Sequence, residues 1–226
     1  MKLRFGLPAL AVLLTAGSMV AGPIVLNFEG IASPSNSEVA IGNFYNGGGG
    51  PNFGISFSDN ALALCLNILN VQSCSNTSRG GQGDPTSQGG GLFFLTGSQT
   101  FMNDPAGFDT GFSLFYSAVN DPGSLSVYDG LNGTGNVLAT LSLPLTPSTC
   151  QGVGSFCPFV PVGVAFSGVA KSIGFAGVGN QIVFDDVTFG SIIPGSTVPE
   201  PATVSLMCLG LGLVALIIRR RNQSQA

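Results

Sequence analysis

The chain contains no histidine and no tryptophan, and only 8% of its 226 residues are charged. Without histidine, neither a Ser-His-Asp nor a Cys-His nucleophile can be assembled, and a zinc site that needs imidazole is excluded too. The low charge does not indicate disorder, because 44% of the residues are hydrophobic and 17 of them are Phe. With 34 Gly and 14 Pro, the composition predicts a folded, glycine-rich β protein without long soluble helices.

Basic residues are scarce between the two ends of the chain. Arg79 and Lys171 are the only bases in residues 22–192, against ten of the eleven acids, all but Glu200. Two minus ten gives a net charge of −8 for this part of the chain. An acidic surface with almost no bases disfavours nucleic acid and anionic lipid as partners, and it leaves carboxylates for cations.

The first 21 residues are typical of a secretory signal peptide. Lys2 and Arg4 precede a largely apolar run over residues 5–16, and small residues follow, with Ser18 or Ala21 at the expected cut by signal peptidase. The apolar run is too short for a stable membrane span. The N-terminus therefore predicts secretion.

The C-terminus is predicted to form a single transmembrane helix. Residues 202–218 carry no charge, and at about 1.5 Å per residue this stretch is roughly 25 Å long. Residues 219–226 follow as a basic tail that begins with Arg219, Arg220 and Arg221. Arginines of this kind stay on the cytoplasmic side, so the preceding domain is expected outside.

A linker over residues 193–201 precedes this helix and ends in Val198-Pro199-Glu200-Pro201. Proline on both sides of Glu200 favours an extended, accessible segment. The order of this segment, the apolar run and the arginines resembles the PEP-CTERM sorting signal of Gram-negative bacteria. The alternative is an ordinary single-span anchor with a chance Pro-Glu-Pro.

The resemblance implies how the protein is processed and where it is delivered, and it does not imply what the domain binds. PEP-CTERM proteins are substrates of an exosortase, a membrane protease-transpeptidase that acts at the Pro-Glu-Pro segment, and they are associated with exopolysaccharide. The resemblance thus implies an anchored protein that is processed and delivered to the cell surface or extracellular matrix. The same tail is also called the ice-binding protein C-terminal domain, but no threonine ladder in the chain suggests an ice-binding face.

Residues 22–192 are predicted to form an antiparallel β-sandwich or jelly roll. Leu125 and Val127 alternate with serines, and Val137 to Leu143 alternates similarly, as half-buried strands do. Nine short segments of this kind are separated by turn residues: 23–28, 54–57, 92–96, 111–119, 124–129, 137–143, 160–166, 171–177 and 181–189. Residues 61–71 fit either a strand or one helical turn.

Glycine stretches and isolated acids in this domain indicate loops. Residues 47–50 and 80–91 are expected to be surface loops, and neither contains a phosphate-binding motif. Asp84, Asp104 and Asp121 lie next to Gly or Pro, which is turn chemistry. Asp129, Asn132 and Thr134 fit either a calcium loop or a hairpin turn, and the turn is the preferred interpretation.

Four cysteines of the exported part predict two local disulfides. The preferred pairs are Cys65 with Cys74 and Cys150 with Cys157, one of three possible connectivities. Cys208 lies within the predicted membrane helix. A zinc site made of these cysteines would need closer pairs and a reducing compartment.

An early Phe28-Glu29 and a late Asp185-Asp186 suggest a cation site. This pattern resembles jelly-roll domains of the MAM and carbohydrate-binding-module kind, whose first and last strands lie side by side. The resemblance implies that Glu29 with Asp185 or Asp186 holds a structural calcium. The alternative is that both aspartates lie at a strand edge and accept backbone hydrogen bonds.

These observations favour a non-catalytic surface or matrix protein, sorted by an exosortase and associated with exopolysaccharide. The alternative is a calcium-stabilised, carbohydrate-binding jelly roll tethered to the membrane, with Tyr45, Tyr116 or Tyr128 as its aromatic surface. A hydrolase with two carboxylates in a cleft is the least favoured function.

Overall fold

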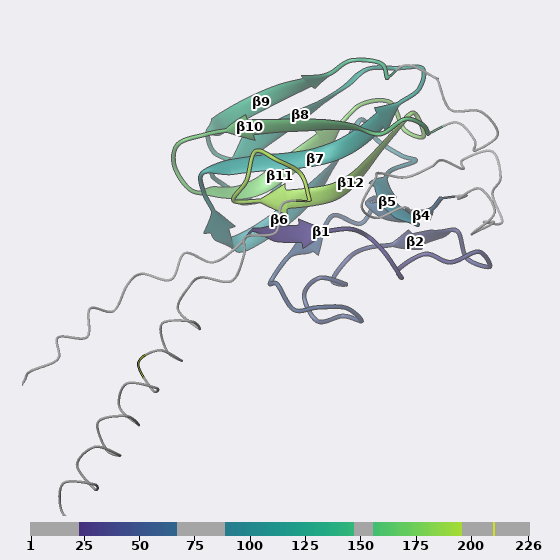
Figure 1. Cartoon of the computed structure of the whole chain (residues 1–226), viewed down its shortest axis with the longest axis horizontal. Helices are drawn as coiled ribbons and strands as arrows, with labels where there is room; N and C mark the ends of the chain where they lie inside the picture. The colour runs from purple at the N-terminus through teal and green to yellow at the C-terminus, as the bar shows by residue number, and fades with distance from the viewer. Residues whose placement is uncertain (1–22, 67–88, 147–155, 196–209, 211–226) are drawn as a thin grey trace, which may run out of the picture.

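Two antiparallel sheets pack face to face in the computed structural model, which describes residues 23–66, 89–146, 156–195 and 210 (Figure 1). The antiparallel β-sandwich predicted from the sequence is therefore confirmed. In the described residues, no helix is long and apolar enough to cross a membrane. The predicted signal peptide and, apart from Gly210, the predicted membrane helix lie outside the described residues.

The larger sheet has seven strands, and the last strand of the chain lies inside it. Its order is β10 (Val160–Ala165), β7 (Gly111–Ala118), β12 (Ile182–Phe189), β5 (Gly90–Phe93), β4 (Leu62–Cys65) and β2 (Glu38–Ala40). The first strand, β1 (Ile24–Leu26), pairs antiparallel with β12, so that Ile24 lies opposite Phe189. The chain therefore enters and leaves the domain side by side.

The smaller sheet has five strands in the order β3 (Ser56–Phe57), β6 (Gln99–Phe108), β11 (Ala170–Ala176), β8 (Gly123–Tyr128) and β9 (Val137–Leu143). The short 3₁₀ turn η2 (Leu131–Gly133) lies in the hairpin between β8 and β9, where the sequence predicts a turn. Residues 137–143 form a strand with the predicted limits.

The alternating side chains place the core between the sheets. Leu125 and Val127 of β8 are buried, whereas the serines between them reach the surface. The Phe175 ring of β11 meets the Phe184 ring of β12 with centroids 5.0 Å apart, which joins the two sheets. Most of the largest buried side chains are phenylalanines, as the composition predicts.

A second hydrophobic cluster covers part of the other side of the larger sheet. It joins Val183 of β12 to Leu64, Leu66 and Phe93, and to Phe156 and Phe159 from the segment before β10. Because Phe184 packs in the main core and Val183 packs in this second cluster, β12 is buried on both faces. The strand that carries the two adjacent aspartates is therefore central rather than at an edge.

Three strands depart from the sequence expectations. The sequence does not predict β2 or the ten-residue β6, in which Asp104, Pro105 and Gly107 indicate a turn. The turn exists as an irregularity within the strand, because the Asp104 carboxylate accepts the N–H groups of Ala106 and Gly107 at 3.0 and 3.2 Å. The predicted loop over residues 80–91 is wrong at its end, because Gly90 and Gly91 begin β5.

Candidate functional site

Asp185 and Asp186 lie at the point where β12 exchanges one neighbouring strand for another. β12 pairs with β5 at Phe184 and with β1 from Val187 onward. On its other side, the register with β7 shifts between Asp185 and Thr188. Asp186 has a φ of 45°, in the left-handed region that few residues other than glycine adopt. The bulge thus places two carboxylates at a break in the sheet.

Both aspartates are buried, which is unusual for consecutive acids in a strand. Asp185 is 0% exposed and Asp186 is 3% exposed. The Oδ1 atom of Asp185 accepts the N–H of Asp186 at 2.7 Å. The expectation of a strand edge is wrong, because β12 lies inside the sheet. Burying carboxylates is costly unless other groups compensate their charge, so this position is the leading candidate for a site in the domain.

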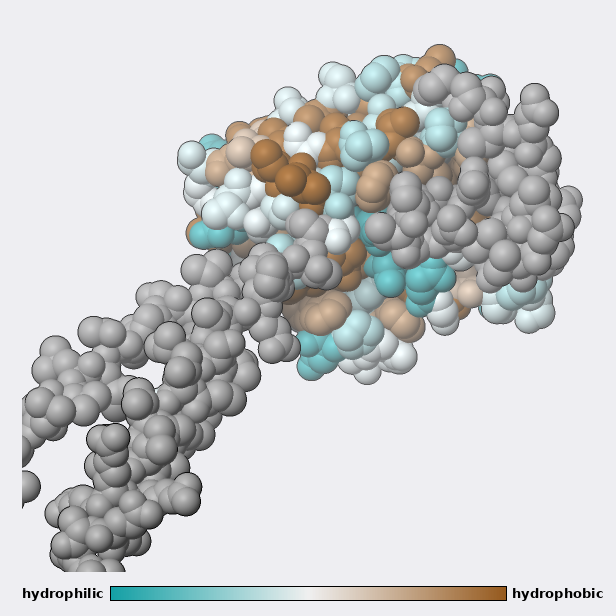
Figure 2. Space-filling model, viewed as in Figure 1, coloured by the Kyte–Doolittle hydropathy of each residue, from teal (hydrophilic) through white to brown (hydrophobic). Residues whose placement is uncertain are grey.

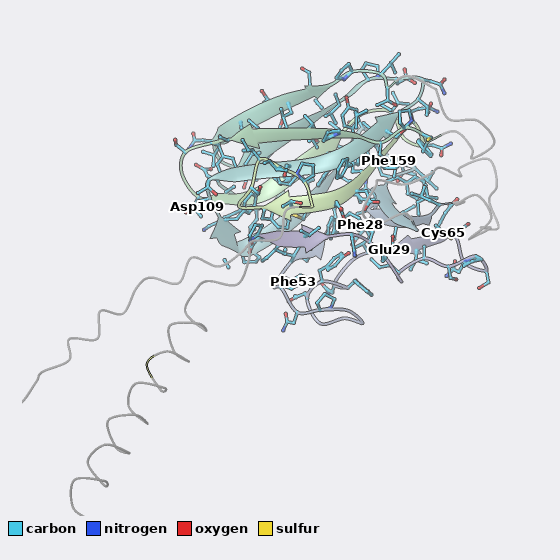
Figure 3. The ribbon with its side chains drawn as sticks, viewed as in Figure 1. Phe28, Glu29, Phe53, Cys65, Asp109 and Phe159 are labelled. Carbon is cyan, nitrogen blue, oxygen red and sulfur yellow. The ribbon has the colours of Figure 1, made fainter. Side chains whose placement is uncertain are left out.

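Glu29 is held at the same break by Gly90, the first residue of β5, and by Gly89 just before it. Its Oε1 atom accepts the N–H groups of Gly89 and Gly90 at 2.7 and 3.1 Å. A Cβ atom on Gly90 would clash with the Phe28 carbonyl oxygen, so only glycine allows this close approach. Figure 3 shows Phe28 and Glu29 beside β5. The glycines that the sequence assigns to a loop therefore position Glu29.

Tyr45 connects these acids, although the sequence does not single it out for this position. Its hydroxyl accepts the N–H of Phe28 at 2.7 Å, and its side chain is 3% exposed. Burial is the main cause that raises the pKa of Tyr45 above 10.0, the Phe28 N–H lowers it, and the charges of Asp185, Glu29 and Asp186 raise it further. All three predicted acids therefore act on one buried hydroxyl.

The raised pKa of Tyr45 predicts a loss of stability in alkali. The folded chain holds this proton more tightly than the unfolded chain, whose tyrosine pKa is about 10. The stabilisation is therefore complete below about pH 10 and is lost as the pH rises toward the folded-state pKa. We expect the urea concentration at the midpoint of unfolding to fall when the pH is raised from about 8 to about 11. The fall is expected to be smaller in Tyr45→Phe. Equal falls in the two proteins would contradict this prediction.

The described residues do not bring three acids into a metal cluster. No group of three or more His, Cys, Asp or Glu side chains within these ranges is placed to hold a metal ion. The Oε1 atom of Glu29 and the Oδ1 atom of Asp185 each accept backbone N–H groups. Calcium binding by Glu29 with Asp185 or Asp186 remains a prediction.

The acids and amides of the β8–β9 hairpin make a turn, as the preferred interpretation has it. The Asp129 carboxylate accepts the backbone N–H of Asn136 at 2.7 Å and its side-chain amide at 2.8 Å. These hydrogen bonds lower the pKa of Asp129. The Thr134 hydroxyl donates to the Leu131 carbonyl at 2.7 Å. These side chains stabilise the hairpin.

Two other predicted sets lie largely outside the described residues. Cys65 and Cys157 are both disulfide-bonded, while Cys74 and Cys150 are not among the described residues, so the preferred pairing remains a prediction. The sorting residues Val198 to Pro201 and Arg219 to Arg221 are not described either. The last described residue before them, Gly195, donates its N–H to the Thr188 hydroxyl of β12 at 3.0 Å.

Comparison with known sequences identifies the C-terminal segment. The PEP-CTERM protein-sorting motif matches residues 197–221. The resemblance of Val198-Pro199-Glu200-Pro201 and the arginine tail to this signal is therefore confirmed, and the motif is that of exported surface proteins. No curated protein matches the chain significantly.

Comparison with solved structures gives only weak similarities. The K2 cleaved adhesin domain of Lys-gingipain has 10% identity and a TM-score of 0.43, with 75% of this chain and 99% of that chain covered. The K1 domain of Lys-gingipain from Porphyromonas gingivalis W83 has 12% identity and a TM-score of 0.40, over 75% and 98%. The module CBM6cm-2 of Cellvibrio mixtus lichenase 5A, solved with cellotriose, has 14% identity and a TM-score of 0.31, over 47% and 81%. None of these similarities transfers a function to this chain.

Proposed function

We propose that the chain is a non-catalytic protein of the cell surface or extracellular matrix, which an exosortase processes at Pro199-Glu200-Pro201. The match of the sorting motif to residues 197–221 carries this proposal. The protein would be anchored in the inner membrane by residues 202–218, would lose this anchor on processing, and would associate with exopolysaccharide outside the cell.

The composition and the fold are consistent with a structural or adhesive role. The chain has no histidine for a nucleophile system. Glu29, Asp129 and Asp104 accept backbone N–H groups that hold strands and turns together. These acids stabilise the fold, which fits a structural domain that contacts other polymers through its outer faces.

The mass of the C-terminus tests the proposal. The native chain and Glu200→Ala are expressed in an exosortase-bearing host, and the extracellular product of each is analysed by mass spectrometry. Loss of the C-terminal segment from the native chain alone supports processing at this motif.

The second candidate function is a calcium-stabilised carbohydrate-binding module that stays tethered to the membrane. The observation that favours it is the burial of Asp185 and Asp186. The charges of these two aspartates and of Glu29 all raise the pKa of Tyr45, so the three acids lie around one hydroxyl. A divalent cation is one group that would compensate such charges. Glu29 with Asp185 or Asp186 would supply the protein ligands of this ion.

On this second candidate, calcium is expected to raise the melting temperature. An ion that binds only the folded chain stabilises it by about 2.7 kcal/mol when its concentration is about 100 times its Kd. The melting temperature is measured by circular dichroism in calcium chloride and in EGTA, for the native protein and for Asp185→Asn. Asp109→Asn, which changes an exposed acid, is the control. Equal melting temperatures of the native protein in calcium and in EGTA would rule the ion out.

A further inference from the structure

Part of the outer face of the five-stranded sheet carries only uncharged side chains. On β8, Ser124, Ser126 and Tyr128 alternate with the buried core residues and point away from the core. The register places Ser126 opposite Gly174 of β11 and Thr140 of β9. We name this surface the neutral face; its members are Gln99, Phe101, Ser124, Ser126, Tyr128, Thr140, Ser142, Gly174 and Ala176.

Two aromatic rings stand on this face above a glycine. Phe101 of β6 lies opposite Gly174, and its ring centroid is 6.4 Å from that of Tyr128 in an edge-to-face arrangement. A Cβ atom on Gly174 would lie 3.1 Å from the Phe101 ring and 3.4 Å from the Tyr128 ring. Both rings are half-buried, so each presents part of its surface to solvent. Tyr45 and Tyr116 are buried, which leaves the partly exposed Tyr128 as the one of the three tyrosines that can contribute an aromatic surface.

The hairpin that contains η2 fixes this pair of rings in place. The Asn103 side chain donates to the Asn132 side chain at 2.8 Å and accepts the Asn132 backbone N–H at 2.7 Å. The Gly133 N–H donates to the Ser172 hydroxyl at 3.0 Å, and Gly133 lies so close to Phe101 that a Cβ atom there would clash with the ring. The face is therefore formed before any ligand arrives, which reduces the entropy lost on binding.

The absence of charge on this face indicates the chemistry of its partner. None of its nine residues is acidic or basic, although residues 22–192 carry ten acids and two bases. A cationic polymer would gain little from this surface compared with the rest of an acidic domain, and an anionic polymer would find no basic side chain on it. Rigid tyrosine area beside Ser, Thr and Gly is a composition that suits contacts with both C–H groups and hydroxyls.

We propose that the neutral face binds one strand of an uncharged polysaccharide. Sugar rings would stack their C–H faces on Phe101 and Tyr128, and their hydroxyls would exchange hydrogen bonds with Ser126, Thr140 and Gln99. The small side chains of Ser124, Ser126 and Ala176 beside the two rings would let the strand lie close to the sheet. The inference rests on the proposed location of the protein at the surface or in the matrix, and it needs no calcium.

Affinity electrophoresis of the detergent-solubilised full chain tests this inference. Native gels contain either a neutral polymer (mixed-linkage β-glucan, dextran or galactomannan) or alginate as the acidic comparison. We expect at least one neutral polymer to retard the protein and alginate to leave its migration unchanged. Tyr128→Ala is expected to weaken the retardation at least tenfold, while Tyr128→Phe, which keeps the ring, stays within about twofold of the native protein.

Two further variants separate recognition from folding. Ser126→Arg places a bulky charge in the middle of the neutral face at a partly exposed position, and it is expected to abolish retardation without lowering the melting temperature. Phe53→Ala removes an exposed aromatic ring outside the neutral face, and it is expected to leave retardation unchanged. Melting temperatures from circular dichroism show that each variant is folded.

Several outcomes would overturn the proposal. They are retardation by alginate alone, no retardation by any neutral polymer, and equal retardation of Tyr128→Ala and the native protein. Sedimentation that changes with Tyr128→Ala while retardation does not would show that a second copy of the chain occupies the face. The C-terminal mass of the exported protein is read separately, so failure of the neutral face and failure of the sorting proposal are distinguishable.

Discussion

Glu200→Ala is expected to leave the exported chain with its complete C-terminus, whereas the native chain is expected to end at the Pro-Glu-Pro segment. The two prolines restrict the backbone on both sides of Glu200, and the substitution removes the carboxylate while it keeps both prolines. The expected effect is therefore on recognition and is close to all-or-none. Mass spectrometry of the C-terminal peptide from the extracellular fraction measures it.

The last residue described before this segment is Gly195, whose N–H donates to the Thr188 hydroxyl of β12 at 3.0 Å. Pro199 follows four residues later in the sequence. We therefore expect a product cut at the Pro-Glu-Pro segment to retain residues 23–195, and the same C-terminal mass measures this.

Asp109→Ala is the matched control for Glu200→Ala. Asp109→Ala removes an exposed acid from the loop between β6 and β7, and it should leave processing as in the native chain. If the native chain keeps residues 202–226 in the exosortase-bearing host, the segment is an ordinary anchor. If Glu200→Ala is processed like the native chain, the carboxylate is not recognised.

The strands that could be predicted are those whose side chains alternate on a simple pattern. β8 and β9 each face the core on one side and solvent on the other, so hydrophobic and polar residues alternate along their sequences. β6 could not be predicted in this way. Its Asp104-Pro105 and Gly107 belong to an irregularity within a strand that continues on both sides, and a local pattern cannot distinguish this from a turn that ends a strand.

The candidate acidic site shows the same limit at the level of single residues. Glu29 and Asp185-Asp186 could be placed near each other because β1 and β12 pair, as the resemblance implies. The contributions of Tyr45 and of Gly89 and Gly90 depend on contacts between segments far apart in the chain. A run of glycines has the same composition in a loop and in a strand that another backbone approaches closely, so the sequence alone could not separate the two.

Phe184→Ala is expected to lower the free energy of unfolding by about 3–5 kcal/mol. The side chain is fully buried, and its ring contacts Phe175 of the other sheet. Phe184 also pairs with Tyr116 of β7 and with Leu92 of β5, so the cavity would open where three strands of the larger sheet meet. For a domain with a typical stability of about 5–15 kcal/mol, this loss is large enough to populate the unfolded chain.

The loss in free energy of unfolding at Phe184 distinguishes one core shared by both sheets from two sheets that are stable independently. Phe184→Leu fills most of the cavity and is expected to cost less than Phe184→Ala. Phe53→Ala, at a side chain that is 39% exposed, is expected to change the stability by less than about 1 kcal/mol. Urea unfolding followed by far-UV circular dichroism measures all three, because the chain has no tryptophan for fluorescence.

A loss of similar size in Phe53→Ala and Phe184→Ala would mean that the ring contact between the sheets does not hold the sandwich together. Two steps in the native unfolding curve would mean that the sheets unfold separately, whereas one step with a cost that grows from Leu to Ala is the expected behaviour of a single core.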